Sequence, residues 1–126
     1  MLPKLEMVQM AHDLARHAAL RLGVIAENVA HTDTPRYRAQ DLKTFAETYR
    51  APFALRQSRA GHLPSAEAAA AQSFDTKDIS APNGNNVSLE GEMVKAAQAR
   101  QEHEMALSIY RATANLLRGA LGRTAG

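Results

Sequence analysis

The sequence contains no cysteine, no tryptophan and only three phenylalanines and three tyrosines. Without cysteine the chain has neither a disulfide framework nor a thiolate nucleophile, and either an oxidising or a reducing compartment stays open. Aromatic residues make up 5% of the chain, which predicts a thin core for an isolated copy because large side chains bury the most apolar area. We therefore expect part of the stability to come from partners.

Charge of one sign and long apolar runs are also scarce. The formal net charge is +2, which is too small to indicate a nucleic-acid or membrane-surface protein, although a pI near 9.2 forbids neither. No segment approaches the roughly 18 apolar residues of a membrane span. The N-terminus lacks the charged, apolar and small-residue regions of a signal peptide. If the protein leaves the cytoplasm, another route must carry it.

The motifs of common enzymes and metal sites are absent as well. There is no glycine-rich phosphate loop, no Gly-x-Ser-x-Gly and no His-Glu-x-x-His. His12 and His17 are five residues apart and do not share a helical face, and no pair of histidines has a zinc-ligand spacing. A di-iron bundle needs a Glu three residues before a histidine, but the residue three positions before His103 is Arg100. We expect no catalytic residue, no cofactor and no metal ion.

What the sequence does contain is two long heptad patterns. The first lies in a predicted helix over residues 4–32, which Pro35 ends because proline lacks an amide donor and disfavours helical geometry in the preceding residue. Small alanines along this seam allow close approach of a second helix. The apolar steps alternate between three and four residues, at Val8, Ala11, Ala15, Ala18, Leu22, Ile25 and Val29.

The second pattern predicts a helix over residues 88–119 with Ser88 as its N-cap. Arg100 and His103 interrupt its apolar seam, and we interpret them as polar contacts that fix the register or meet another subunit. Equal spacing in both patterns predicts an all-α fold in which the terminal helices form an antiparallel, coiled-coil-like hairpin. The expected seam comprises Met93, Ala96, Arg100, His103, Leu107, Tyr110, Ala114, Leu117 and Leu121.

The middle of the chain has weaker patterns. Residues 39–50 are compatible with a short helix or an extended arm. From 51 to 86, prolines, glycines and an alanine run at 68–71 predict an extended, low-complexity linker with a possible short helix, and Asn83-Gly84 is a turn signal. We expect a core helix over 1–34, an arm over 35–50, a linker over 51–86 and a second core helix over 87–126, the two helices forming one discontinuous domain.

Polar residues gather where the first helix ends. Their order resembles the N-terminal signature of the bacterial flagellar rod, hook and filament-joining proteins, usually met as Asn-x-Ala-Asn-x-x-Thr-Pro-x-Tyr. Two residues depart from this signature. His31 occupies the position of its second Asn, and Arg36 occupies a position where a small residue such as Gly is usual. The short chain and the segment 85–98 look most like the proximal rod proteins of this family. The matching residues are Asn28, Ala30, Asp33, Thr34, Pro35, Tyr37 and Ala39.

The resemblance covers about residues 5–50 and 84–121, and it implies a structural role. Members assemble as a helical array whose terminal helices form an inner tube, which transmits torque and conducts exported subunits. It implies that Asn28 and Asp33 satisfy backbone groups at the helix end, that Pro35 holds Thr34 extended, and that Tyr37 packs on the next subunit.

The resemblance also implies a location and partners. These are the basal-body rod in the periplasmic space, reached through the flagellar type III export apparatus without a cleaved signal peptide. The partners are copies of the chain itself, the other proximal rod proteins, the MS-ring to rod junction protein and the export gate.

Other classes of function fit parts of the sequence. A cytoplasmic helical-hairpin adaptor or export chaperone would show the same heptads without chemistry. A membrane-surface helix would need a basic face opposite an apolar one, whereas the first helix mixes acids and bases, so we expect no stable lipid anchoring. The tripeptide 36–38 could stack on a single-stranded base. One aromatic between two arginines is common by chance, and we expect no nucleic-acid partner.

Overall fold

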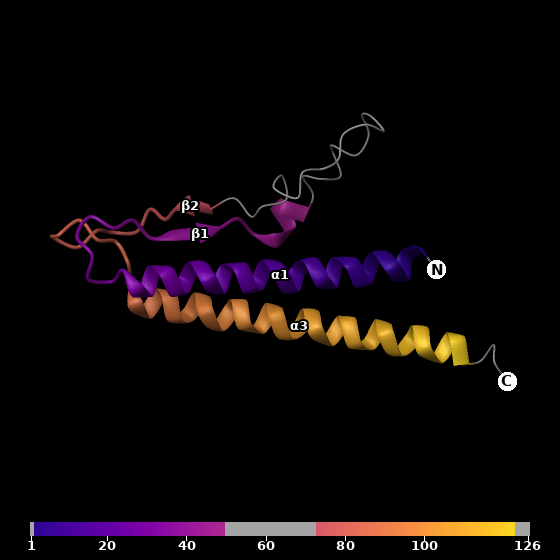
Figure 1. Ribbon diagram of the computed structural model, residues 1–126. Helices are drawn as coiled ribbons and strands as arrows, with labels where there is room; N and C mark the ends of the chain where they lie inside the picture. Colours follow the sequence, from indigo (N-terminus) through magenta and orange to yellow (C-terminus); the bar gives the residue numbers. More distant parts are fainter. Residues whose placement is uncertain (1, 50–72, 123–126) are drawn as a thin grey trace, which may run out of the picture. The chain divides into compact units, whose positions relative to one another are not determined.

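The computed structural model describes residues 2–49 and 73–122 (Figure 1). Its elements are α1 (Leu2–Ala30), β1 (Gln40–Leu42), β2 (Ser73–Asp75) and α3 (Leu89–Gly122), with one further helical turn at 45–49. The chain is mostly helical, and the two long helices pack against each other. This confirms the coarse form of the predicted fold.

The chain divides into two compact units, and each long helix contributes to both. The helix-pair unit comprises Met1–Leu22 and Val94–Gly126, and the turn unit comprises Gly23–Met93. The first unit therefore draws on both ends of the chain, whereas the second contains the segments that join the helices.

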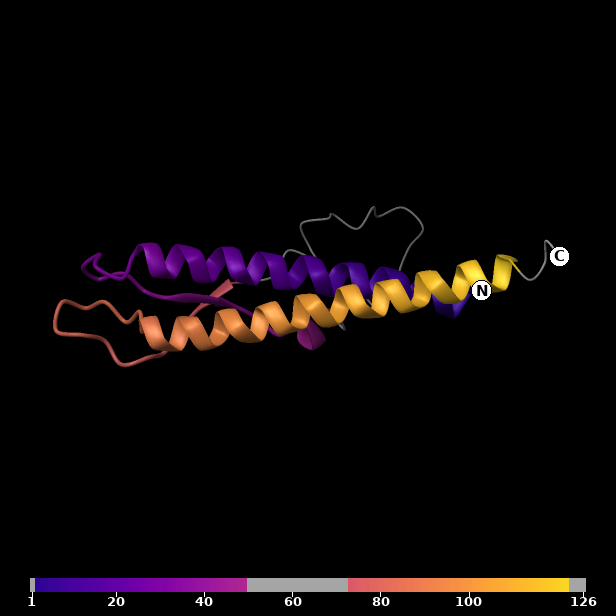
Figure 2. The same ribbon diagram turned by 90° about the horizontal axis from the view of Figure 1, so that it is seen from below.

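In the helix-pair unit, the two helical segments run side by side in opposite directions (Figures 1 and 2). The side chains buried between them are mostly small, which allows helix axes to approach closely. The hydroxyl of Thr113, which is also buried, donates to the carbonyl of Ile109 at 2.8 Å, so its polar group is satisfied. The buried apolar residues are Ala11, Leu14 and Ala18 from α1 and Ala99 and Ala106 from α3.

The predicted seam of α3 is wrong by about one residue. Leu107 and Tyr110 are 37% and 46% exposed, and Leu117 is half-buried, whereas Ala106 is completely buried. The physical reason is size: the helices approach through a row of small side chains seven residues apart, and the larger leucine one position further along lies beside that row. Leucine size is thus a poor guide to the seam here.

Because the seam of α3 is shifted by about one residue, Arg100 and His103 do not lie in the row of buried side chains. Arg100 is exposed and forms an i, i+4 ion pair with Glu104, with 3.7 Å between Nε and Oε1. His103 is half-buried at the flank of the contact. Arg100 therefore does not fix the register of the helix pair, because it points away from the row of buried alanines.

In α1 the predicted seam is partly right. Ile25 is buried and Leu22 half-buried, but Val29 is 39% exposed. The buried position at this end of α1 is Asn28, one residue earlier. A polar residue takes the inward position because it has buried hydrogen-bond partners in the turn unit.

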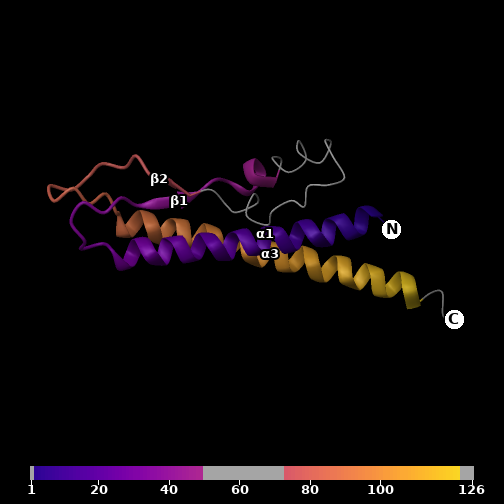
Figure 3. The same cartoon turned by 45° about the horizontal axis from the view of Figure 1, so that its top comes forward.

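The turn unit contains a small antiparallel sheet that the sequence did not predict. Residues 40–42 of β1 pair with 75–73 of β2, and the two strands lie side by side in Figure 3. Thr76 N donates to Ala39 O at 2.9 Å and extends the pairing. The segment 39–49 is thus extended first and helical afterwards, so both open alternatives occur in turn.

The predicted linker needs correction at its C-terminal end. Residues 73–86 contain β2 and a turn, in which Gly84 N donates to Ala81 O at 2.8 Å. The turn confirms the Asn83-Gly84 signal. Residues 51–72, with the possible alanine helix, lie outside the described residues.

The start of α3 agrees with the predicted cap. Ser88 precedes the helix, and its Oγ accepts a hydrogen bond from Gly91 N at 3.2 Å. Glu90 and Glu92 occupy the first turn, where negative charge interacts favourably with the helix dipole.

Candidate functional site

Asn28 is the centre of the turn unit and is fully buried in the last turn of α1. Its Nδ2 donates to Gln40 O at 2.7 Å and to Glu92 Oε2 at 3.0 Å. Its Oδ1 accepts from Gln40 N at 3.0 Å and from the Tyr37 hydroxyl at 3.3 Å. Both amide hydrogens and both oxygen lone pairs are thus used.

This geometry corrects the role predicted for Asn28. It does not satisfy the backbone groups freed at the end of α1. It joins the helix to the chain beyond the turn, through Gln40, and to the first turn of α3, through Glu92. Because Glu92 is only 2% exposed, a hydrogen bond to its carboxylate offsets part of the cost of burying that charge.

The last carbonyls of α1 are bound by the residues that follow directly: His31 N donates to Glu27 O and Asn28 O, and Thr32 donates to Val29 O through its backbone N and its hydroxyl. The carbonyls of the turn beyond α1 are bound by Asn85. Its Nδ2 lies within hydrogen-bond distance of three carbonyl oxygens, those of His31 at 2.8 Å, Thr32 at 3.0 Å and Thr34 at 2.8 Å. Its Oδ1 accepts from Val87 N at 2.7 Å. A residue far along the chain therefore holds the turn that follows α1.

Asn86 makes a second connection between the same two segments. Its Oδ1 accepts from Ala39 N at 2.6 Å, its Nδ2 donates to Thr76 O at 2.9 Å, and its backbone N donates to Tyr37 O at 3.3 Å. Asn85 and Asn86 were not among the residues predicted from the sequence to hold the turn. Two adjacent asparagines before a serine N-cap were the available signal, since asparagine side chains readily bond nearby backbone.

Thr34, Pro35, Arg36 and Tyr37 form a tight turn. Tyr37 N donates to Thr34 O at 3.3 Å, and Arg36 has a φ of 63°. Proline at the second position and positive φ at the third define a type II turn, in which glycine usually takes the third position. Thr34 is the first residue of this turn.

A second residue with positive φ lies against this turn. Gly84 has a φ of 84°, and a Cβ added to it would lie 3.4 Å from Arg36 Cα. Arg36 N also donates to Asn83 O at 3.1 Å. Glycine at position 84 thus permits both the backbone conformation and the close approach of the two turns.

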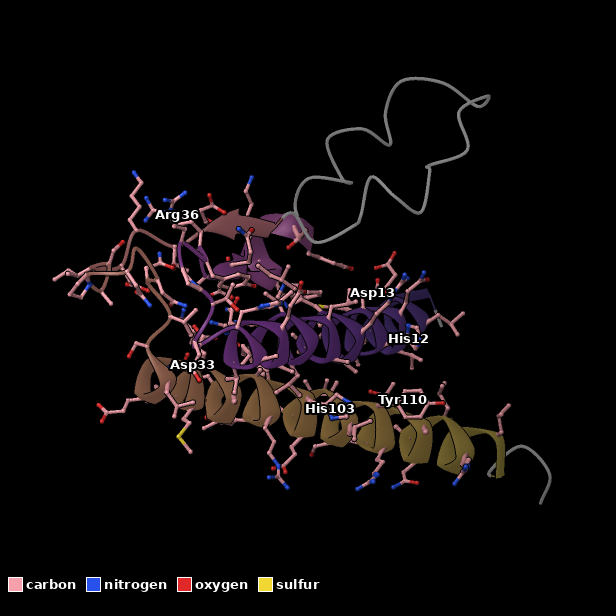
Figure 4. The ribbon with its side chains drawn as sticks, turned by 60° about the vertical axis from the view of Figure 1, so that its left-hand side comes forward. His12, Asp13, Asp33, Arg36, His103 and Tyr110 are labelled. Carbon is pink, nitrogen blue, oxygen red and sulfur yellow. The ribbon has the colours of Figure 1, made fainter. Side chains whose placement is uncertain are left out.

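Arg36→Gly should stabilise the protein by about 1 kcal/mol, because an L-residue with a side chain has a steric cost at positive φ that glycine lacks. The free energy of unfolding in urea measures this. Arg36→Ala is the matched control: it removes the guanidinium, which is exposed at the outer end of the turn (Figure 4), but keeps the Cβ. An equal gain from both variants would attribute the effect to charge and refute the backbone argument.

Tyr37 is half-buried against its own chain. Its ring stacks on His31, with 4.5 Å between centroids and 16° between planes, and its hydroxyl donates to Asn28. His31 Nδ1 lies 3.1 Å from Thr34 Oγ1. His31 thus packs against the turn.

Burial raises the pKa of Tyr37 above its ordinary value of 10.0, and the negative charges of Glu27 and Glu92 raise it further. A raised pKa means that the folded state holds the proton more tightly, so this contribution to stability is present below pH 10 and is lost as the pH rises through the folded-state value. In an ultraviolet titration of tyrosinate, Tyr37→Phe should remove a component that titrates above pH 10. Loss of an early-titrating component would contradict this assignment.

The remaining motif residues are exposed. Ala30, Asp33 and Pro35 all face solvent, and within residues 2–49 and 73–122 Asp33 makes no hydrogen bond or ion pair (Figure 4). Asp33 therefore does not satisfy backbone groups at the helix end, where His31 and Thr32 bond the last carbonyls of α1. These exposed residues leave one surface of the turn free.

The described part of the chain offers little for chemistry. No three histidine, aspartate or glutamate side chains among those residues converge on a point where a metal ion could bind. Neither α1 nor α3 combines the length and apolar character needed to cross a membrane. The polar network around Asn28 links backbone segments and holds them in place.

Comparison of the chain with models of known protein families gives no match, and comparison with curated proteins gives no significant match.

Proposed function

We propose that the chain is a structural subunit of the bacterial flagellar basal-body rod. Its sequence resembles most the FlgB-type proteins of the proximal rod. In this proposal, copies assemble into a helical tube that transmits motor torque and conducts exported subunits, and the chain performs no catalysis.

The observation that carries the proposal is the apolar surface left on the helix-pair unit. The two helices bury mainly small side chains against each other and leave large apolar ones exposed to water. Further copies would remove this area from water, at about 25 cal/mol per Å². The exposed side chains are Leu5, Met7 and Leu20 on α1 and Val94, Met105, Leu107, Tyr110, Leu116 and Leu121 on α3.

The turn unit gives a second, separate argument for the proposal. Its hydrogen bonds give a physical reason for the residue types that carry the resemblance: a fully bonded amide at Asn28, a proline in the second turn position and an aromatic hydroxyl that reaches Asn28. Together they fix the direction in which the chain leaves α1. A subunit of a regular array needs such a fixed exit.

The proposal implies a set of partners and a location. These are copies of itself, the other proximal rod proteins, the MS-ring to rod junction protein and the flagellar type III export gate, in the rod within the periplasmic space. A chain with a thin core of small residues suits passage in an unfolded state, because little buried area opposes unfolding.

The test is to delete the gene from its source bacterium and to study the purified protein. We expect loss of swimming, basal bodies without hooks, and rescue by the wild-type gene. In sedimentation velocity the purified protein should form species that grow with concentration. A discrete dimer at every concentration, with normal motility of the deletion strain, would support a hairpin adaptor and refute the rod proposal.

A further inference from the structure

The outer faces of the helix-pair unit carry charges of opposite sign. On α1, Glu6 and Asp13 each lie five residues before a buried alanine, and on α3, Arg111 and Arg118 each lie five residues after a buried side chain. Five residues correspond to about 140° around a helix, so both pairs point away from the contact between α1 and α3. We call Glu6 and Asp13 the acidic ridge and Arg111 and Arg118 the basic ridge.

These charges are available to a partner. Glu6, Arg111 and Arg118 are exposed, and within the described residues none of the three forms an ion pair. The Asp13 side chain is 41% exposed and points away from α3 (Figure 4). Its nearest opposite charge is the neighbouring His12, with 3.7 Å between Nδ1 and Oδ1.

The spacing of the two ridges is the same. In each ridge the charges are seven residues apart, which is two turns and about 10.5 Å along a helix. An antiparallel alignment that places Glu6 beside Arg118 therefore places Asp13 beside Arg111.

The occupant that fits this surface is a second copy of the chain. The ridges of one copy cannot meet, because both face away from their own helix contact. Contact of the acidic ridge with a second acidic ridge, or of the basic ridge with a second basic ridge, would bring like charges together. Contact of the acidic ridge with the basic ridge of another copy pairs opposite charges.

We propose that copies associate head to tail, with the acidic ridge of one copy bound to the basic ridge of the next. Such a contact uses two different surfaces of each copy, so each new copy presents a free ridge at either end of the assembly. Contacts of this kind close into rings or continue as helical assemblies. The inference rests on the proposed self-assembly and adds which surfaces meet.

One pair of positions along this alignment is less favourable. Leu20 on α1 comes level with Glu104 on α3, an apolar side chain beside an acid. Glu104 is already bound to Arg100 of its own helix, so its charge is partly neutralised within the same copy. The ridge pairs therefore decide the alignment.

The test uses two charge-reversed proteins. The first carries Glu6→Lys and Asp13→Lys, and the second carries Arg111→Glu and Arg118→Glu. In each alone, like charges meet across the interface, and the concentration needed for assembly should rise about tenfold or more. In a mixture of the two, every contact again pairs opposite charges. Assembly should then return to the wild-type concentration range.

The helix content of the variants and the behaviour of the wild type decide how the result is interpreted. As the control, circular dichroism should show the wild-type helix content in all variants. If the wild type assembles but the reversed proteins assemble equally well, or the mixture fails to recover, the ridge contact is refuted and the proposed function stands. If the wild type does not self-associate at any concentration, the proposed function fails with it.

Discussion

Replacing Asn28 with alanine is expected to lower the free energy of unfolding by about 3 to 5 kcal/mol, because it leaves several buried groups without a hydrogen bond at once. The backbone of Gln40 loses partners for both its N–H and its carbonyl, and the Tyr37 hydroxyl loses its acceptor. The buried carboxylate of Glu92 loses a donor at 3.0 Å. Urea denaturation at neutral pH measures the change.

The matched control is Asn115→Ala, which makes the same substitution at an exposed position of α3. It should leave stability within about 0.5 kcal/mol of the wild type or raise it slightly, since alanine favours helix. Equal effects at the two positions would show that the amide network does not contribute to stability.

Asn28→Asp tests the same network through charge. The substitution keeps the shape but places a second carboxylate next to Glu92, and two adjacent carboxylates cannot both be ionised without a large cost. We expect severe destabilisation at neutral pH and a difference from the wild type that becomes smaller as the pH falls, because a proton bound between the two carboxyls removes the repulsion. A difference that does not depend on pH would contradict the buried contact.

The ends of the helices follow from short-range chemistry, and so the sequence predicts them well. Pro35 excludes helix around it, and Ser88 offers an oxygen to Gly91 N in the first turn of α3. Both effects act within a few residues, where spacing in the sequence equals spacing in space. α1 ends at Ala30, before the proline, because the chain has already begun to turn.

The register of α3 could not be predicted because two interpretations of the pattern compete. Large side chains such as Leu107 and Leu117 repeat at heptad spacing, and so do the small ones one position away. A seam of small residues lets the helices approach closely, whereas a seam of leucines buries more area, and a single chain cannot show which contact is made within a copy and which between copies. The exposed leucines are compatible with both kinds of contact being used.

The hydrogen-bonded turn was missed for a different reason. Asn85 and Asn86 lie more than 45 residues from their partners after α1, with sequence separations of 51 between Asn85 and Thr34 and 47 between Asn86 and Ala39. Side-chain to backbone bonds of this range leave no periodic signal. The short strands β1 and β2 are similarly hidden, because three-residue strands show too little alternation to be detected.

Ala106→Leu should lower the free energy of unfolding by about 2 to 3 kcal/mol, because the alanine is completely buried and a larger side chain must push the helices apart. Leu107→Ala, one position along, should cost less than about 1 kcal/mol, well below the cost of truncating a fully buried leucine. Urea denaturation of dilute protein, below the concentration at which copies associate, compares the two.

In an assembly measurement, Leu107→Ala should have a clear effect although it changes the stability of the isolated chain only slightly. Leu107 is 37% exposed in a single copy, so its remaining area is available to a neighbour, and Leu107→Ala should raise the concentration needed for assembly while the isolated chain stays folded. If Leu107→Ala is the more destabilising variant in dilute protein, the seam runs through the leucines after all. The exposed apolar surface that carries the proposed function would then belong to the core of each copy, and self-assembly would lose its main physical support.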